Sequence, residues 1–177
     1  IKNFIQFCET IQAVPVGLHE LVEPTKVSKD DEICDDVLTR EEASAILDHL
    51  GKYEYASLRH VVVLLLWKCG MRIGGLRALD AGDFDEGRPA IEIRHRPETG
   101  TPLKRKGNSE RDVIITPEAA DVVRDYIGTN RPDSTDDYGR KALVATEYGR
   151  ASRTTITKHV YIATQPCSYN GGECPFD

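Results

Sequence analysis

A run of seven apolar residues, 61–67 (VVVLLLW), constrains the fold more than any other feature of this chain. It is far shorter than the roughly 20 residues that a membrane span needs, so we expect a buried helix over 58–69. The next residue, Gly70, suits the left-handed position that ends many helices. Arg72 follows at the turn into a short helix over 75–79. An arginine held at a rigid corner can clamp a phosphate with two parallel hydrogen bonds; alternatively, it caps the preceding helix or pairs with a carboxylate.

The remaining patterns predict a mostly helical α+β fold with a small antiparallel sheet. Thr39 and Glu42 form a capping box, in which a hydroxyl and a carboxylate satisfy the free amides of a helix start. Alternating apolar residues predict strands over 91–94 and, more loosely, over 112–115, with a long connection rich in Pro and Gly between them. Apolar residues at helical spacing predict the other helices. These helices cover 1–13, 40–50, 117–127 and 152–163, and a further short strand is expected at 143–145.

The chain of 177 residues suits one domain with an appendage. Residues 14–36 contain three breakers and an acidic cluster and are interpreted as a linker after the helix of residues 1–13. The first residue is not Met and no signal peptide follows it, so the N-terminus is interpreted as a cut end. Five cysteines at irregular spacing do not resemble a secreted disulfide framework. We therefore expect a cytoplasmic protein without a membrane span.

The net charge of −6 is unevenly distributed along the chain. Residues 94–111 carry six cations and two carboxylates, a local balance of +4, so the rest of the chain is near −10. A second window, 150–159, has no acid and places hydroxyls and cations at a helix start, which suits phosphate. Two positive windows on an acidic body would focus a polyanion onto one face, although solvated loop charges would give the same pattern. The predicted DNA-binding residues are Lys104, Arg105, Arg111, Arg150, Arg153, Thr154 and Lys158.

Three motifs, in order and at suitable separations, resemble those of the tyrosine recombinases, the phage-integrase family. Residues 70–85 (GMRIGGLRALDAGDFD) resemble the first conserved box, and residues 38–42 (LTREE) resemble the usual opening of the catalytic domain. Residues 106–115 (KGNSERDVII) resemble the β-hairpin lysine motif. The resemblance covers roughly residues 38–130. One position departs from the family pattern, because the acid expected three residues after the arginine is replaced by Gly75.

The resemblance implies both a fold and a reaction. In this family a small helical core-binding domain precedes the catalytic domain, so residues 1–13 would be its last helix. A tyrosine hydroxyl attacks a DNA phosphate, giving a 3′-phosphotyrosyl link and a free 5′-hydroxyl without metal or nucleotide. Arg72 matches the first phosphate-clamping arginine, and Lys106 matches the hairpin lysine that protonates the leaving oxygen. Lys104 is the alternative hairpin lysine, and Lys106 could instead make a plain phosphate contact.

Parts of the family's catalytic apparatus do not appear in this sequence. The second box, His or Lys-x-x-Arg, is expected after residue 150 or so but is not found, and Tyr148, Tyr161 and Tyr169 do not match the context of the nucleophile. We therefore expect residues 37–177 to be the N-terminal part of a truncated catalytic domain that does not cleave DNA alone. The intact protein would act as a tetramer on double-stranded DNA. The alternatives are a non-catalytic DNA-binding or regulatory protein on the same scaffold and a zinc-linked interaction module.

Cys167 and Cys174 frame a turn-rich segment near the end of the chain. Two cysteines can form half of a structural zinc site, which would need further ligands beyond residue 177. Plain thiols are the alternative. No other cofactor is expected.

Overall fold

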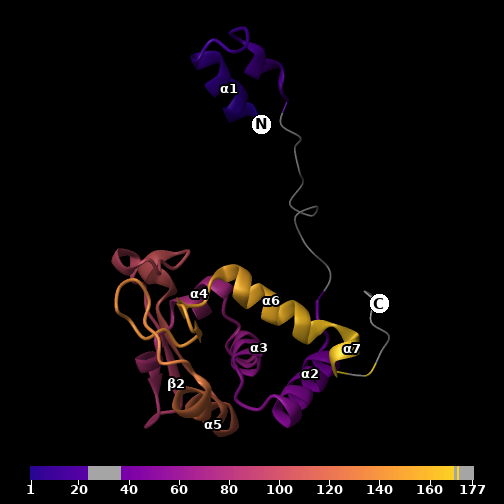
Figure 1. The fold of residues 1–177 in the computed structure, drawn as a ribbon, viewed down its shortest axis with the longest axis vertical. Helices are drawn as coiled ribbons and strands as arrows, with labels where there is room; N and C mark the ends of the chain where they lie inside the picture. Colours follow the sequence, from indigo (N-terminus) through magenta and orange to yellow (C-terminus); the bar gives the residue numbers. More distant parts are fainter. Residues whose placement is uncertain (24–36, 170, 172–177) are drawn as a thin grey trace. The chain divides into compact units, whose positions relative to one another are not determined.

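The computed structural model describes residues 1–23, 37–169 and 171, and the chain divides into two units, 1–38 and 39–177 (Figure 1). In the first unit, α1 (Lys2–Thr10) packs against a 3₁₀ helix, η1 (Leu18–Leu21). The Glu9 carboxylate accepts a hydrogen bond from the His19 amide at 2.7 Å and pairs with His19 Nδ1 at 2.7 Å. Part of the predicted linker is therefore helical and tied to α1, while residues 24–36 lie outside the described segments.

The predicted buried helix, α3 (Leu58–Cys69), is the centre of the second unit. It contacts α2 (Arg40–Tyr53), α4 (Ile73–Ala78), α5 (Pro117–Asp125) and α6 (Arg153–Thr164). The Thr39 capping box is present at the start of α2. This helix continues past Gly51 to Tyr53 because Gly51 does not adopt the left-handed conformation that would end it. Gly70, by contrast, has φ 55° and ends α3 as predicted.

The small antiparallel sheet has the order β1-β2-β3. Its strands are β1 (Phe84–Asp85), β2 (Ala90–Ile93) and β3 (Arg111–Ile114), with Ile93 opposite Arg111. A separate hairpin joins β4 (Ala145–Thr146) to β5 (Gly149–Arg150). The strand predicted over 143–145 corresponds to β4, which begins only at Ala145. The amide of Leu143 donates to the Leu79 carbonyl instead of to a neighbouring strand of a sheet.

Short helical turns complete the second unit. The π-helical turn Tyr126–Asn130 (η5) extends α5, and α7 (Pro166–Tyr169) follows α6. Three 3₁₀ turns lie near the sheet: η2 (Ala81–Asp83), η3 (Pro97–Thr99) and η4 (Lys106–Ser109). The predicted fold class, mostly helical α+β with a small antiparallel sheet, is confirmed.

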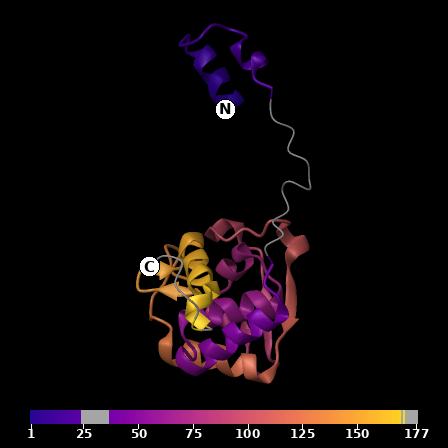
Figure 2. The same cartoon turned by 90° about the vertical axis from the view of Figure 1, so that its right-hand side faces the viewer.

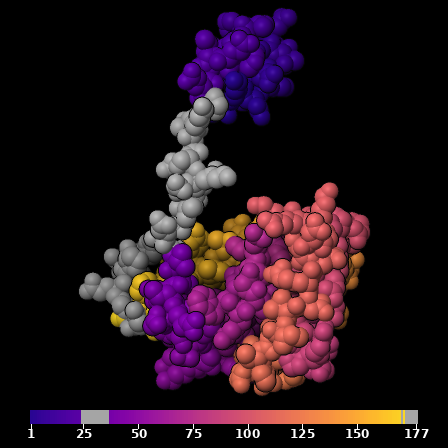
Figure 3. Space-filling view, turned by 180° about the vertical axis from the view of Figure 1, so that it is seen from behind, coloured from indigo at the N-terminus to yellow at the C-terminus, as the bar shows by residue number. Residues whose placement is uncertain are grey.

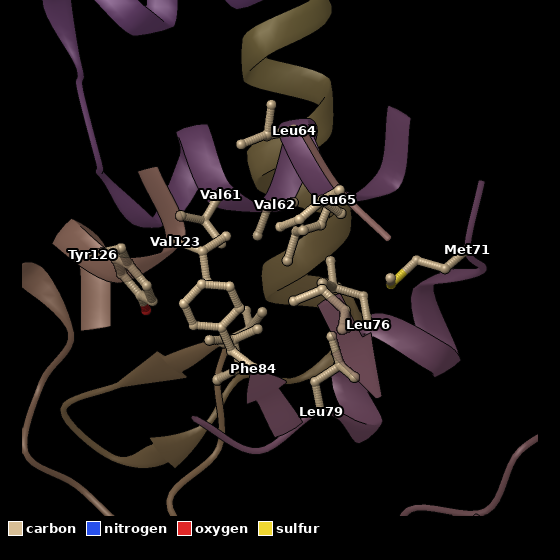
Figure 4. Close-up of a cluster of buried hydrophobic side chains, with 14 of the residues drawn as sticks. Val61, Val62, Leu64, Leu65, Met71, Leu76, Leu79, Phe84, Val123 and Tyr126 are labelled. Atoms are coloured by element: carbon tan, nitrogen blue, oxygen red, sulfur yellow. The ribbon is translucent and has the colours of Figure 1, made fainter. Parts of the chain in front are cut away.

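One apolar core joins the helices to the sheet. Figure 4 shows Val61, Val62 and Leu65 of α3 directed toward side chains that follow the arginine turn and toward α5. The phenol of Tyr126 is fully buried in this cluster. In Figure 2, α6 in yellow and the sheet in salmon lie on opposite sides of the central helices. The same core therefore holds the arginine turn, the sheet and the start of α6 in place.

Candidate nucleic-acid interface

A cleft of about 860 Å³ lies among the end of α3, the turn into α4, the loop before β3 and the start of α6. Gold atoms of α6 are recessed beside magenta atoms of α3 and α4 in the space-filling view (Figure 3). Four of its lining residues are cations: Arg72, Lys104, Arg111 and Arg153. No carboxylate is among the described lining residues. The cleft is therefore an uncompensated positive site, the kind of surface that attracts a polyanion.

Arg72 occupies the corner that the sequence predicted. Gly70 reverses the chain, and the Arg72 carbonyl accepts hydrogen bonds from the amides of Gly75 at 2.8 Å and Leu76 at 3.0 Å. Arg72 is therefore the N-cap residue of α4, which begins earlier than predicted. Its exposed guanidinium makes no hydrogen bond or ion pair with any residue that the structure describes. Gly70, and not Arg72, caps the end of α3, and Arg72 pairs with no described carboxylate, so its side chain is available for a ligand.

The structure separates the two candidate hairpin lysines. Lys104 lines the cleft, next to the buried Leu103, whose amide donates to His95 Nδ1 at 2.9 Å. Lys106 does not line it and begins η4 with a left-handed φ of 52°. Both side chains are exposed and have no ion pair among the described residues. The position of Lys104 favours the alternative assignment over the one that the motif suggests.

Arg153 reaches the cleft from the first turn of α6. Ser152 caps this helix by accepting a hydrogen bond from the Thr155 amide at 3.0 Å. The Arg153 guanidinium lies 3.5 Å from the point that a Cβ would occupy at Gly74. The Arg153 side chain therefore lies directly against α4 at Gly74. Of the other predicted DNA-binding residues, Arg111 lines the cleft, whereas Arg105, Thr154 and Lys158 are exposed but do not line it.

Arg150 has a structural position that does not suit DNA binding. Its side chain is only 4 % exposed. It donates to the carboxylates of Asp80 at 2.6 Å and Asp136 at 2.8 Å, and to the carbonyls of Arg77 and Leu79. These four hydrogen bonds hold the guanidinium inside the protein, so the structure favours a structural role for Arg150 over the predicted DNA contact.

The first basic window is also partly neutralised. Arg94 pairs with Glu92 and Asp112, each at 2.8 Å, and Arg96 forms a bidentate ion pair with Asp83. The hydrogen bonds from Arg88 and then Arg94 hold the pKa of Asp112 below its usual value. The local excess of +4 in the sequence is thus reduced in the fold, because carboxylates outside the window face its arginines.

Sequence reasoning missed an arginine network behind the cleft. Arg140 donates to Asp80 at 2.8 and 2.9 Å, to the hydroxyl of Thr101 and to the carbonyl of Ala78. With Arg150, it ties the C-terminal end of α4 to the hairpin and to the loop at residues 97–101. No local signal marks these residues, since all of their partners but Asp136 are 39 to 73 positions away in the chain. The network fixes α4, the helix whose N-cap residue is Arg72.

The predicted zinc half-site is only partly within the described residues. Cys167 is in α7, and Cys174 lies outside them. Among the residues with a described position, no group of three or more His, Cys, Asp or Glu could hold a metal ion. None of the described helices is long and apolar enough to cross a membrane.

The fold is a mostly helical α+β domain with a positive cleft, and comparison with known proteins identifies its family. The model of the Phage integrase family matches residues 36–164, so the chain belongs to this family. The crystal structure of XerA recombinase has a similar fold, with a TM-score of 0.59 and 17% sequence identity. The match covers 98% of this chain and 55% of the recombinase, so the chain spans about half its length. No curated protein matches this sequence. The resemblance to tyrosine recombinases is confirmed.

Proposed function

We propose that residues 37–177 are the N-terminal part of the catalytic domain of a site-specific recombinase of the tyrosine class and that residues 1–13 are the last helix of a preceding core-binding domain. The observation that carries the proposal is the cleft with Arg72, Lys104, Arg111 and Arg153 and no described carboxylate. Attack on a DNA phosphate spreads negative charge over the non-bridging oxygens, and fixed cations stabilise that charge. The cleft would hold the backbone of double-stranded DNA at the scissile phosphate.

The proposed reaction assigns a role to two of these residues. A tyrosine hydroxyl loses its proton to solvent and forms a bond to phosphorus while the bond from phosphorus to the 5′-oxygen breaks, which leaves a 3′-phosphotyrosyl link. Arg72 clamps the non-bridging oxygens through its planar pair of donors. Lys104 donates the proton that the leaving 5′-oxygen needs, with Lys106 as the alternative donor. Attack by the freed 5′-hydroxyl of another strand rejoins the DNA and releases the tyrosine, so the reaction needs no metal or nucleotide.

We further propose that residues 1–177 do not cleave DNA by themselves. The sequence after residue 150 has no His or Lys-x-x-Arg motif. No tyrosine lines the described part of the cleft. In the intact protein, the remaining groups would complete the site, and a tetramer would act on two duplexes in the cytoplasm. Zinc at Cys167 and Cys174 would be structural and take no part in the reaction.

A non-catalytic DNA-binding or regulatory protein on the same scaffold is the second candidate. Gly75 and the missing second box favour it, because position 75 lacks the family's acid and no His or Lys-x-x-Arg motif follows residue 150. The coding sequence after the Asp177 codon separates the two candidates. A second box followed by a tyrosine supports the enzyme, whereas an early stop codon supports the regulatory protein.

The proposal is tested by measuring the fluorescence anisotropy of a labelled duplex with the purified chain. We expect binding that weakens with salt and that is reduced in Arg72→Ala but not in Arg124→Ala. Arg124 is a matched control because it is a partly exposed arginine of α5 outside the cleft. Equal binding by Arg72→Ala and the parent would refute the assignment of the cleft. A protein–DNA adduct that survives detergent would refute the claim that the chain alone is inactive.

A further inference from the structure

The β4–β5 hairpin presents two side chains that no described residue uses. Its two-residue turn is Glu147 and Tyr148, between the paired residues Thr146 and Gly149. Tyr148 is 97% exposed, and Glu147 is also exposed. Neither the phenol nor the carboxylate makes a hydrogen bond or ion pair with the described part of the chain. Tyrosine is one of the residue types that most often anchor binding interfaces.

The backbone of this hairpin is held firmly. The Ser134 hydroxyl donates to the Thr146 carbonyl at 2.7 Å, and Arg150 anchors β5 through its buried ion pairs. Gly149 has φ 99°, and a Cβ at this position would lie 2.5 Å from the Thr135 carbonyl oxygen. Only glycine fits this close approach. The turn is thus presented in one conformation, which reduces the entropy that binding would cost.

The positive surface of the cleft continues toward this hairpin. Arg77 lies one turn after Gly74 on α4, so it shares the helix face over which Arg153 lies. Burial lowers the pKa of Arg77, and the nearby cations Arg150 and Arg153 act in the same direction. Arg77 also lines a small pocket of about 100 Å³ with Tyr138 and Tyr148. A polyanion bound along Arg153 and Arg77 would therefore lie close to the hairpin.

The chemistry of the tip suits base edges better than phosphates. Glu147, and the exposed Asp137 beside the same small pocket, would repel a phosphate. A glutamate can accept a hydrogen bond from the cytosine amino group, and a phenol can donate to or accept from a base edge. The major groove is wide enough for a two-stranded β-ribbon. Contacts to bases specify sequence, whereas contacts to phosphates position the protein.

We propose that the tip of the β4–β5 hairpin enters the major groove of the bound duplex and that Glu147 and Tyr148 read one or two base pairs of the target site. This inference rests on the proposed DNA binding by the cleft. The two surfaces then have different roles. The cleft binds the DNA backbone, and the hairpin contributes to sequence specificity.

The experiment is a selection from a pool of random duplexes, followed by sequencing of the DNA that the chain retains. The variants are Tyr148→Ala and Glu147→Gln, with Tyr53→Ala as the matched control at an exposed tyrosine of α2. We expect the parent and the control to enrich the same motif. Each tip variant should weaken the preference at one or two adjacent positions by about fivefold or more, while binding to the unselected pool changes by less than about twofold. Unchanged thermal melting would verify that the variants are folded.

Three results would overturn the inference. The first is an unchanged preference in both tip variants, and the second is a parent that binds DNA without enriching any motif. The third is a change of oligomeric state in Tyr148→Ala, measured by light scattering, with the preference intact, because the tip would then contact a protein. If the parent does not bind the pool at all, the proposed function itself fails, and this outcome is distinct from the other three.

Discussion

Two arginines three positions apart, Arg150 and Arg153, have opposite surroundings. Arg150 is buried and donates to two carboxylates and two carbonyls. Arg153 is exposed, lines the cleft and has no hydrogen bond or ion pair with a described residue. The surroundings of the two arginines differ in the same way. The arginines of the network around Asp80 are neutralised by carboxylates of the chain, whereas the cations of the cleft are not. An arginine cluster in a sequence therefore indicates a binding site only where the fold provides no internal partners.

The two regions also differ in what they contribute to folding. Removing one partner of a buried ion pair leaves the other charge uncompensated, so the network around Asp80 supports the native state. The four cations of the cleft repel one another, and among the described residues their side chains make a single hydrogen bond, from Arg111 to the Ser109 carbonyl at 3.3 Å. A bound phosphate backbone would relieve this repulsion. We interpret the cleft as a place where stability is given up for binding.

The largest expected effect is on the free energy of unfolding and tests the ion-pair network around Asp80. Arg150→Ala removes donors from Asp80 and Asp136 and from two carbonyls, so we expect the free energy of unfolding to fall by about 3–5 kcal/mol. Arg153→Ala is the matched control and should change it by less than about 0.5 kcal/mol. Chemical denaturation measures both. Similar losses in the two variants would show that the distinction between network and cleft is wrong.

The next effect tests the cleft. Arg72→Ala should reduce duplex affinity by about 10- to 100-fold, which corresponds to the loss of charge-assisted hydrogen bonds of about 1.5–3 kcal/mol. Its melting temperature should remain that of the parent, because the side chain has no described internal partner. Anisotropy titration and thermal melting of the same preparation measure the two quantities. A large drop in melting temperature would assign Arg72 to the fold instead.

A smaller difference is expected between the two lysines. Lys104→Ala should weaken duplex binding more than Lys106→Ala, because only Lys104 lines the cleft. Lysine acetylation with and without DNA, analysed by mass spectrometry, offers an independent measurement. Stronger protection of Lys106 than of Lys104 would return the assignment to the residue that the sequence motif indicates.

The smallest effect concerns the pH dependence of folding. His60 Nδ1 accepts a hydrogen bond from the Ala56 amide at 3.2 Å, and burial lowers the pKa of His60. The native state therefore binds fewer protons than the unfolded chain, so stability is fully present above the unfolded pKa near 6.5 and is lost as the pH falls through the lower native pKa. His60→Asn retains an acceptor without this titration, so its unfolding free energy should depend less on pH between 7 and 5. Burial lowers the pKa of His159 as well, so part of the dependence should persist. If the unfolding free energies of His60→Asn and the parent changed equally with pH, this explanation would be contradicted.

Local signals were sufficient for several parts of the structure. The apolar run, Gly70 and the Thr39 capping box predicted α3, its end and the start of α2, because each depends on residues close in the chain. The same local signal located Arg72 at a helix corner. The resemblance of three ordered motifs supplied the family, which composition alone could not have done.

Long-range pairing explains what the sequence could not predict. Arg150 and Asp80 are 70 positions apart, and Arg94 is neutralised across the sheet by Asp112. Whether a basic residue has an internal partner depends on strand register and loop packing, which charge counting does not capture. The choice between Lys104 and Lys106 likewise depends on the path of a loop that is anchored at the buried Leu103.

The salt dependence of duplex affinity tests the central claim, that the cations of the cleft bind a DNA backbone, most directly. The logarithm of the association constant should fall with the logarithm of salt concentration with a slope of about −0.9 for each phosphate neutralised. We predict that Arg72→Ala and Arg153→Ala each make this slope shallower by about 0.9 and that Arg124→Ala leaves it unchanged. Slopes that are equal in all four proteins would contradict the claim and place the DNA elsewhere on the molecule.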